Sequence, residues 1–289
     1  MILNASGCLD ALTAPEVAGE LDAFVTKTVT PLPRGGNDPV RIAETDVGML
    51  NSIGLANPGI DRFADDVLPR LEDLGIPIWV SVGGFSTSEY AELCAILDRR
   101  SEVAAIELNV SCPNVAEPAG SVSEIVSAAR GATSKTLYTK LSPASADIAA
   151  VAEAAAAAGT DGLSLVNTIR GLALDARTLK PALSTAAGGL SGPALRPIAL
   201  AAVFACHRAT GLPIVAMGGI ETGRHALELI AAGATACALG TILFSDPEAP
   251  ARIRAELAAE AEALGFENPL AARAVAHGEK SPIPLRHVA

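Results

Sequence analysis

Aromatic residues, positive charge and long apolar runs are all scarce in this sequence of 289 residues. Phe, Trp and Tyr make up 3% of the chain, which weakens any interpretation based on base stacking. The net charge is -11, whereas a nucleic-acid backbone requires a basic surface. The longest alanine run, Ala154–Ala158, is too short to cross a bilayer, and no signal-peptide pattern opens the chain. We therefore expect neither nucleic acid nor a membrane as a partner.

Paired cysteines are also missing. The five cysteines, Cys8, Cys94, Cys112, Cys206 and Cys237, are widely spaced and form no Cys-x-x-Cys motif. We therefore expect no zinc or iron–sulfur site in this chain, and a reducing, cytoplasmic setting. Lone cysteines are most often small buried hydrophobes, which we predict for Cys94, Cys206 and Cys237. Cys112 differs because it lies in a loop beyond a strand, where a thiol can act as an acid, a base or a nucleophile.

Half of the chain is hydrophobic, and about eight apolar strands alternate with helices along it. This pattern predicts an α/β fold, a single (β/α)₈ TIM barrel over residues 1–289, with a doubly wound open sheet as the rival. Thr28–Leu55 and Ile169–Gly192 are expected to be long inserted loops on the C-terminal face. The expected strands are Met1–Asn4, Asp22–Lys27, Ile76–Val82, Val103–Ile106, Lys135–Lys140, Gly162–Val166, Pro213–Met217 and Ala234–Leu239. The expected helices include Asp61–Leu74, one capped by Ser86 or Thr87, one opened by the capping box Ser121–Glu124, Asp147–Ala158, Thr222–Ala232 and Pro247–Leu264, with an irregular tail from Gly265.

Polar residues or glycines follow nearly every expected strand, and a barrel gathers these strand ends on one rim. Each residue alone is as easily explained by a turn or by solvation, so only the whole set favours a site. Gly218-Gly219 and Gly240-Thr241 follow the last two strands, where barrels commonly bind phosphate, and predict a phosphorylated cofactor. The other strand-end residues are Ser6, Gly7, Lys27, Thr28, Ser81, Asn109, Cys112, Asn114, Lys140, Asn167 and Thr168.

Amides and ammonium groups give this rim its chemistry. Asn51, Asn109, Asn114 and Asn167 can each donate and accept hydrogen bonds, which suits a pyrimidine ring. Lys27 and Lys140 supply positive charge for a carboxylate or for the anionic edge of a reduced flavin. Two alternatives remain open at this point: a metal-free barrel isomerase or lyase with a Schiff-base lysine, and a non-catalytic paralogue.

Ten ordered segments of the chain, from its first residues to about Leu264, resemble the class 1 dihydroorotate dehydrogenases. They are Asn4–Gly7, Thr26–Thr28, Pro39–Thr45, Asn51–Gly59, Glu107–Asn114, Lys140–Pro143, Val166–Thr168, Gly188–Pro193, Met217–Ile220 and Leu239–Thr241.

The resemblance implies a TIM barrel that binds one FMN and oxidises dihydroorotate to orotate in de novo pyrimidine (UMP) biosynthesis. It implies that Cys112 is the base that takes a proton from C5 while a hydride passes from C6 to flavin N5. No metal is implied, and Lys140 is expected beside the N1–C2 edge of the flavin. The FMN residues implied are Ser6, Lys27, Thr28, Asn109, Lys140, Val166, Gly192, Gly218, Gly219, Gly240 and Thr241. The substrate residues implied are Lys27, Asn51, Ser52, Ile53, Gly54, Leu55, Asn109, Asn114, Asn167 and Thr168.

Within class 1, Asn51–Gly59 and Gly189–Pro193 resemble class 1B. That resemblance implies a homodimer that passes electrons to NAD through a second subunit carrying FAD and a 2Fe–2S cluster. The alternatives are a class 1A-type homodimer that uses fumarate, or a paralogue with a related substrate or no independent activity. The chain departs from the family pattern in three places: it starts at the first barrel strand without the usual N-terminal hairpin, the segment after Asn114 is short, and Ser81 replaces an asparagine.

Overall fold

An eight-stranded, all-parallel sheet forms the centre of the molecule in a computed structural model that describes residues 1–110 and 120–278. The strand order is β1-β12-β11-β8-β7-β6-β5-β2, which is the order of the strands along the chain once two insertions are set aside. The predicted barrel is therefore confirmed. The strands are β1 Ile2–Asn4, β2 Phe24–Val25, β5 Ile78–Val82, β6 Val103–Asn109, β7 Thr136–Leu141, β8 Gly162–Leu165, β11 Ile214–Met217 and β12 Ala236–Leu239.

A buried asparagine helps to close the sheet into a barrel. β1 pairs with β12, and a single bridge from Leu3 to Ala23 joins it to β2. The Asn4 side chain completes this seam, because its Nδ2 donates to Val25 O at 2.7 Å and its Oδ1 accepts from Val25 N at 2.8 Å. A buried amide needs such partners, and here it replaces hydrogen bonds that the short strands do not make.

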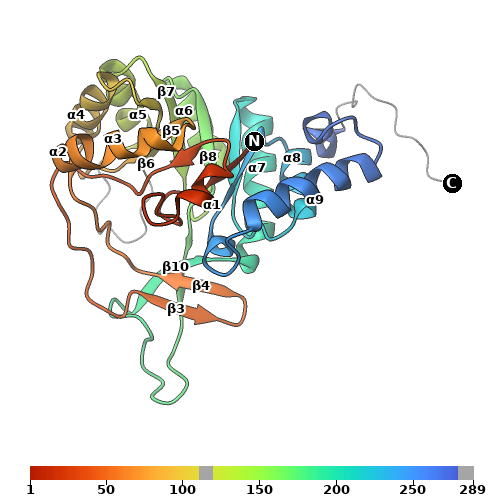
Figure 1. Cartoon of the computed structure of the whole chain (residues 1–289), viewed down its shortest axis with the longest axis horizontal. Helices are drawn as coiled ribbons and strands as arrows, with labels where there is room; N and C mark the ends of the chain where they lie inside the picture. The colour runs from red at the N-terminus through yellow and green to blue at the C-terminus, as the bar shows by residue number, and fades with distance from the viewer. Residues whose placement is uncertain (111–119, 279–289) are drawn as a thin grey trace.

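Helices cover the outside of the barrel (Figure 1) and begin at the residues that the sequence indicates. Ser86 accepts from Glu89 N, Ser121 and Glu124 form the predicted capping box, and Asp147 accepts from Ala150 N. Among the described residues, no helix has the length and apolar character required to cross a membrane. The helices are α1 Pro15–Gly19, α2 Ile60–Arg62, α3 Leu68–Leu71, α4 Thr87–Asp98, α5 Val122–Ala132, α6 Ile148–Ala157, α7 Arg196–Thr210, α8 Gly223–Ala231 and α9 Ala249–Ala263.

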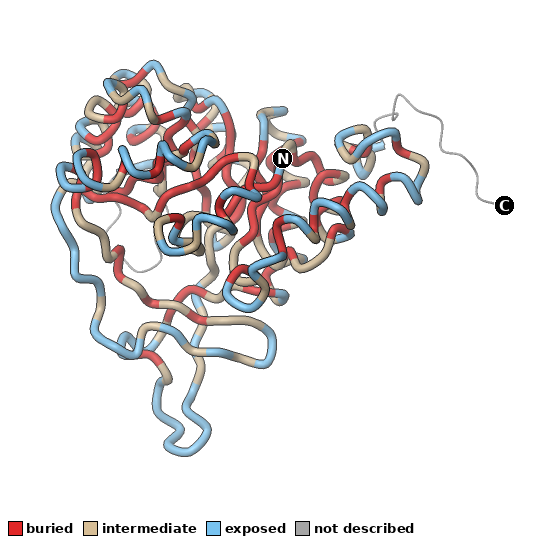
Figure 2. Tube along the Cα trace, viewed as in Figure 1, coloured by how far each residue is buried: buried red, intermediate tan, exposed pale blue. Residues whose placement is uncertain are grey.

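The two expected loops are not irregular. They contribute β3 Ile42–Thr45, β4 Gly48–Asn51, β9 Ile169–Leu172 and β10 Ala187–Ser191, which form one antiparallel sheet in the order β3-β4-β10-β9. This small sheet projects from the barrel (Figure 1), and its hairpin ends are exposed (Figure 2). The sequence did not reveal this sheet because β4 pairs with β10, which is far away in the chain. In addition, none of the four strands has a clear alternation of apolar and polar residues in its sequence.

Two further expectations differ in detail. The helix predicted over Asp61–Leu74 is interrupted by a π-helical turn, Phe63–Val67, in which Leu68 N donates to Phe63 O. Pro69 follows at once and has no N–H to donate, so the wider turn accommodates it. The tail from Gly265 contains two 3₁₀ turns, Pro269–Ala272 and Val275–His277, and the ring of His277 stacks on Phe204 with centroids 4.0 Å apart.

The interior of the barrel has an apolar side and a polar side. Leu3, Ala5, Val25, Met217 and Ala238 belong to a buried apolar cluster from β1, β2, β11, β12 and the residues beside them. Polar side chains occupy β6 to β8 instead: Glu107, Lys140 and Ser164 are all buried. Because alternate residues of a strand share a face, Glu107 points to the same side as Asn109.

Candidate active site

A cavity of about 300 Å³ lies at the carboxyl ends of the barrel strands, between them and the small sheet. Strand ends from opposite sides of the barrel meet in it, as the convergence argument predicts. All residues predicted to hold a phosphorylated cofactor line this cavity: Ser6, Lys27, Thr28, Asn109, Lys140, Val166, Gly192, Gly218, Gly219, Gly240 and Thr241.

A chain of side-chain hydrogen bonds runs along one wall of the cavity. Asn167 Nδ2 donates to Asn109 Oδ1 at 3.2 Å, and Asn109 Nδ2 donates to Thr28 Oγ1 at 3.1 Å. Thr28 Oγ1 lies 3.1 Å from Ser81 Oγ, which is buried beneath the wall. The Tyr90 hydroxyl donates to the Asn109 carbonyl at 2.8 Å. These contacts fix the amide orientations, so the wall presents a set pattern of donors and acceptors to a ligand.

The side chain of Lys27 packs against Gly7 at the edge of the cavity. A Cβ at Gly7 would come within 2.7 Å of Lys27 Cδ and 2.9 Å of Lys27 Nζ, and Gly7 also has φ +78°. The positive φ favours glycine, and a Cβ here would displace the end of the Lys27 side chain, so glycine leaves room for the ammonium beside the cavity. Ser6 Oγ donates to Thr26 O at 2.8 Å, which ties this turn to the segment that carries Lys27.

Lys140 brings the second ammonium, from inside the barrel. Its Nζ lies 3.7 Å from Glu107 Oε1, and the two side chains are only 7% and 2% exposed. In the register of β6 with β7, Lys140 is opposite Asn109, so Glu107 is the diagonal neighbour below it.

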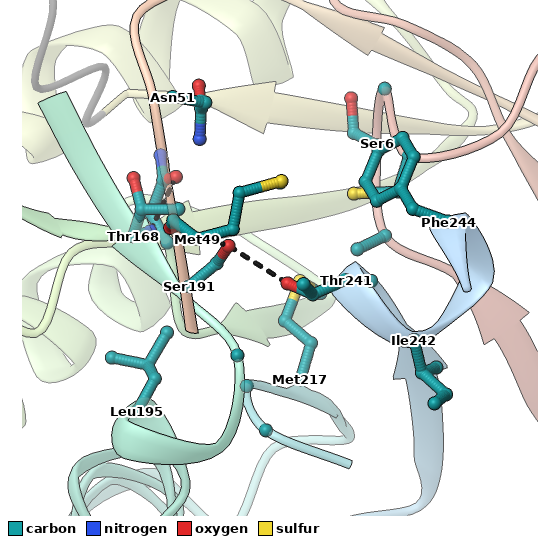
Figure 3. A pocket seen from close by; sticks show the side chains of 18 of the residues that line it. Ser6, Met49, Asn51, Thr168, Ser191, Leu195, Met217, Thr241, Ile242 and Phe244 are labelled. Carbon is teal, nitrogen blue, oxygen red and sulfur yellow. Dashed lines mark hydrogen bonds between the residues drawn. The ribbon is translucent and has the colours of Figure 1, made fainter. Parts of the chain in front are cut away.

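The glycine turns lie at the opposite wall. Gly218, Gly219 and Gly240 line the cavity together, and the hydroxyl of Thr241 donates to Ser191 Oγ at 2.9 Å (Figure 3). A Cβ at Gly219 would come within 2.9 Å of both Arg196 N and Gly192 O, at φ +71°. The backbone therefore approaches itself closely here, and the Gly218-Gly219 turn lines the cavity.

The small sheet covers the cavity with residues from β4 and the segment after it. Asn51, Ile53, Gly54 and Leu55 line the cavity, and so do Asn167 and Thr168 from the end of β8. Ser52 does not line it: its hydroxyl accepts from Asn37 Nδ2 at 2.8 Å and from Thr185 Oγ1 at 2.6 Å. The alternation of side chains along an extended segment accounts for this, because Asn51 and Ile53 face one way and Ser52 the other.

Several lining residues were not predicted from the sequence. Met49 and Ser191 come from the small sheet, Met217 from the end of β11, and Leu195, Ile242 and Phe244 from the turns around the glycines (Figure 3). Ser191 and Met217 lie within segments that carry the family resemblance, but no role was predicted for either. The other apolar residues carry no motif of their own, so only the fold could reveal them.

Thiols occupy different environments in the described part of the chain. Cys94, Cys206 and Cys237 are fully buried, as predicted. Cys8 lines the cavity, and burial raises the pKa of its thiol although the charges of Lys140 and Lys27 lower it. The sequence offered one indication that Cys8 lines the cavity, because it directly follows the predicted strand-end residues Ser6 and Gly7. The predicted base Cys112 and the predicted substrate residue Asn114 lie outside the described residues.

Comparison with known proteins agrees with the family resemblance seen in the sequence. A family model described as "Dihydroorotate dehydrogenase" matches residues 1–260. The chain is 45% identical to the dihydroorotate dehydrogenase B (NAD(+)) catalytic subunit of Desulforudis audaxviator, over 84% of this chain and 81% of the relative. It is 40% identical to the catalytic subunit of the same name in Listeria monocytogenes serovar 1/2a, over 92% and 91%.

A solved structure has the same fold. The crystal structure of DHODH from Eimeria tenella in complex with ferulenol superposes with a TM-score of 0.80, covering 96% of this chain and 85% of that one, at 24% identity. The match over residues 1–260 and the identities of 40% and 45% lead to one conclusion: this chain belongs to the dihydroorotate dehydrogenase family, and it resembles the catalytic subunits of the B form.

Proposed function

We propose that the chain is the catalytic subunit of a class 1B dihydroorotate dehydrogenase, a single FMN-binding domain over residues 1–289 that oxidises dihydroorotate to orotate in pyrimidine biosynthesis. The observation that carries this proposal is the meeting of a glycine turn, two ammonium groups and an amide wall in one cavity. Each part matches a different portion of an FMN and a pyrimidine ring, and the chain's family performs oxidation at a CH–CH bond.

The residues fit FMN on grounds of donor chemistry. The turns at Gly218-Gly219 and Gly240-Thr241 follow the seventh and eighth barrel strands, where backbone N–H groups suit a phosphate. Lys140 is the cation for the ring edge that becomes anionic on reduction, and Ser6, Thr28 and Asn109 supply polar contacts around it. Bound FMN supplies the hydride acceptor. The protein's own part is to hold and orient the ring and to keep water from it.

The substrate half of the cavity combines one cation with amides. Lys27 suits the carboxylate of dihydroorotate, and Asn51, Asn109 and Asn167 suit alternating carbonyl and N–H groups of its ring. Ile53, Gly54, Leu55 and Thr168 complete the lining. We also assign Asn114 to substrate binding, with the family resemblance as its support. We assign to Cys112 the removal of the C5 proton, with the family resemblance as its support.

We further propose that electrons leave through a partner subunit to NAD, as the names of the two catalytic-subunit relatives suggest. In this arrangement the chain forms a homodimer, and the partner carries FAD and the 2Fe–2S cluster. In the part of the chain that the structure describes, no group of three or more His, Cys, Asp or Glu could hold a metal. The four described cysteines are free thiols, which agrees with a cytoplasmic site of action.

Mass spectrometry of the released cofactor and a two-acceptor assay test this proposal. The purified chain should release FMN, form orotate from dihydroorotate with an artificial dye, and fail to reduce NAD until the partner subunit is added. Orotate formation with fumarate as the acceptor would favour the class 1A alternative instead. A colourless protein that borohydride traps covalently with a substrate would contradict the flavin assignment.

A further inference from the structure

Glu107 places a carboxylate inside the barrel, at a buried position that an apolar side chain could also fill. Its side chain is 2% exposed, and it lies on β6 two residues before Asn109, which lines the cavity. Carboxylates are almost never fully buried unless they are paired. We therefore looked for a cation or hydrogen-bond donor that pairs with the Glu107 carboxylate.

That partner is Lys140, and their contact is electrostatic. Glu107 Oε1 lies 3.7 Å from Lys140 Nζ, which is an ion-pair separation beyond hydrogen-bond length. Within the described residues, Oε1 accepts no hydrogen bond. Lys140 Nζ thus has the carboxylate on its barrel side, while the residue also lines the cavity.

Stability alone does not account for this pair. A buried ion pair adds little to stability compared with apolar residues of the same size, because both charges lose their hydration. The opposite side of the same barrel is filled by such apolar residues, among them Leu3, Val25 and Met217. The charge at Glu107 is therefore better explained by what it does to the cation beside the cavity.

We propose that Glu107 is a positioning residue that holds the Lys140 ammonium at the cavity and offsets part of its charge. It thereby limits how strongly the site favours the reduced, anionic isoalloxazine ring over the oxidised ring. This inference rests on the proposed function for the identity of the ligand. The pairing itself follows from the geometry of Glu107 and Lys140 alone.

Removal of the Glu107 charge tests whether this carboxylate offsets part of the Lys140 charge. Glu107→Gln keeps the size of the side chain and removes the negative charge 3.7 Å from the ammonium, so the equilibrium should shift toward reduced FMN by about tenfold. For a two-electron couple this is about 30 mV in the positive direction. The measurement is anaerobic photoreduction against a reference dye, without substrate. Glu107→Asp keeps the charge and should lie closer to wild type than Glu107→Gln.

A matched control is available one residue before the same strand. Glu102 precedes β6, and its carboxylate is paired with Arg100 at 2.8 Å, away from the cavity. Glu102→Gln removes one negative charge and one ion pair, and should leave the potential unchanged. An unchanged or more negative potential in Glu107→Gln, or an equal shift in Glu102→Gln, would overturn the proposal.

A stability cycle tests the pairing without any flavin. In the apo-protein, Glu107→Gln should lower the unfolding temperature when Lys140 is present, because it removes the carboxylate that faces this buried cation. In a Lys140→Met background the same change should raise it, because it removes an unpaired carboxylate. An equal change in unfolding temperature in both backgrounds would overturn the pairing. This measurement uses the apo-protein, so it can be made even if Glu107→Gln does not bind FMN. Failure of dihydroorotate to reduce the flavin would instead count against the proposed function, since neither test here uses that substrate.

Discussion

The Asn167 side chain donates to Oδ1 of Asn109 at 3.2 Å, and so joins the ends of β8 and β6 across the end of β7. Asn109 in turn donates to Thr28, so one amide orients groups from three strands. Through this contact, the loss of a single side chain should disturb a whole wall of the cavity.

Replacement of Asn109 by Ala should weaken orotate binding by at least about tenfold, since unpaired polar groups in a buried site cost about 1–3 kcal/mol. Isothermal titration calorimetry on the FMN-loaded protein measures this. Asn268→Ala is the control, because Asn268 caps a 3₁₀ turn at Ala271 N and does not line the cavity. Equal orotate affinity in Asn109→Ala and wild type would remove the amide wall from substrate binding.

Replacement of Gly219 by Ala should reduce FMN affinity by at least about tenfold, because the new Cβ meets Arg196 and Gly192 at the turn assigned to the phosphate. The matched control is Gly211→Ala: Gly211 also has positive φ, at the end of α7, but no atom lies within 4 Å of its added Cβ. Both variants should lose about 1 kcal/mol of stability from the backbone conformation. Fluorescence titration with FMN separates them, and similar affinities would contradict the phosphate assignment.

Replacement of Cys112 by Ala should leave FMN bound and slow flavin reduction by dihydroorotate by at least about 100-fold, the scale for the loss of a positioned base. Cys94→Ala serves as the comparison, since Cys94 is buried in α4 away from the cavity. Stopped-flow absorbance of the flavin gives both rates. A Cys112→Ala rate equal to that of Cys94→Ala would exclude Cys112 as the base.

Stability should fall in acid partly through Asp98. Hydrogen bonds from the Thr133 hydroxyl and Ser134 N hold the pKa of this carboxyl below its usual 3.8. Because the pKa is lowered in the folded state, the stabilisation is present above about pH 4 and is lost as the pH falls through the folded value. The stability difference between wild type and Asp98→Asn should therefore shrink in acid. Urea unfolding at a series of pH values measures it, and a constant difference would refute this role.

The barrel and most of its rim could be predicted because their signals are local. Apolar runs that end in polar residues or glycine mark each barrel strand, and closure of the barrel brings these ends together without further information. Asn109, Lys140 and Gly240 were found in this way, and all three line the cavity.

The remainder depends on pairings between distant parts of the chain. The small sheet exists only because β4 and β10 meet, and this pairing also turns Ser52 away from the cavity. The role of Glu107 was missed for a similar reason: as one letter in an apolar strand it has no signal until Lys140 is placed beside it. Apolar lining residues such as Met217 cannot be told from core residues by sequence pattern alone.

The decisive measurement is an anaerobic single turnover of the purified, FMN-loaded chain with dihydroorotate. The flavin absorbance should bleach, and one orotate should form for each FMN reduced, with no partner subunit and no NAD present. Persistence of the oxidised spectrum with dihydroorotate in excess, in protein whose FMN dithionite reduces normally, would contradict the proposed activity.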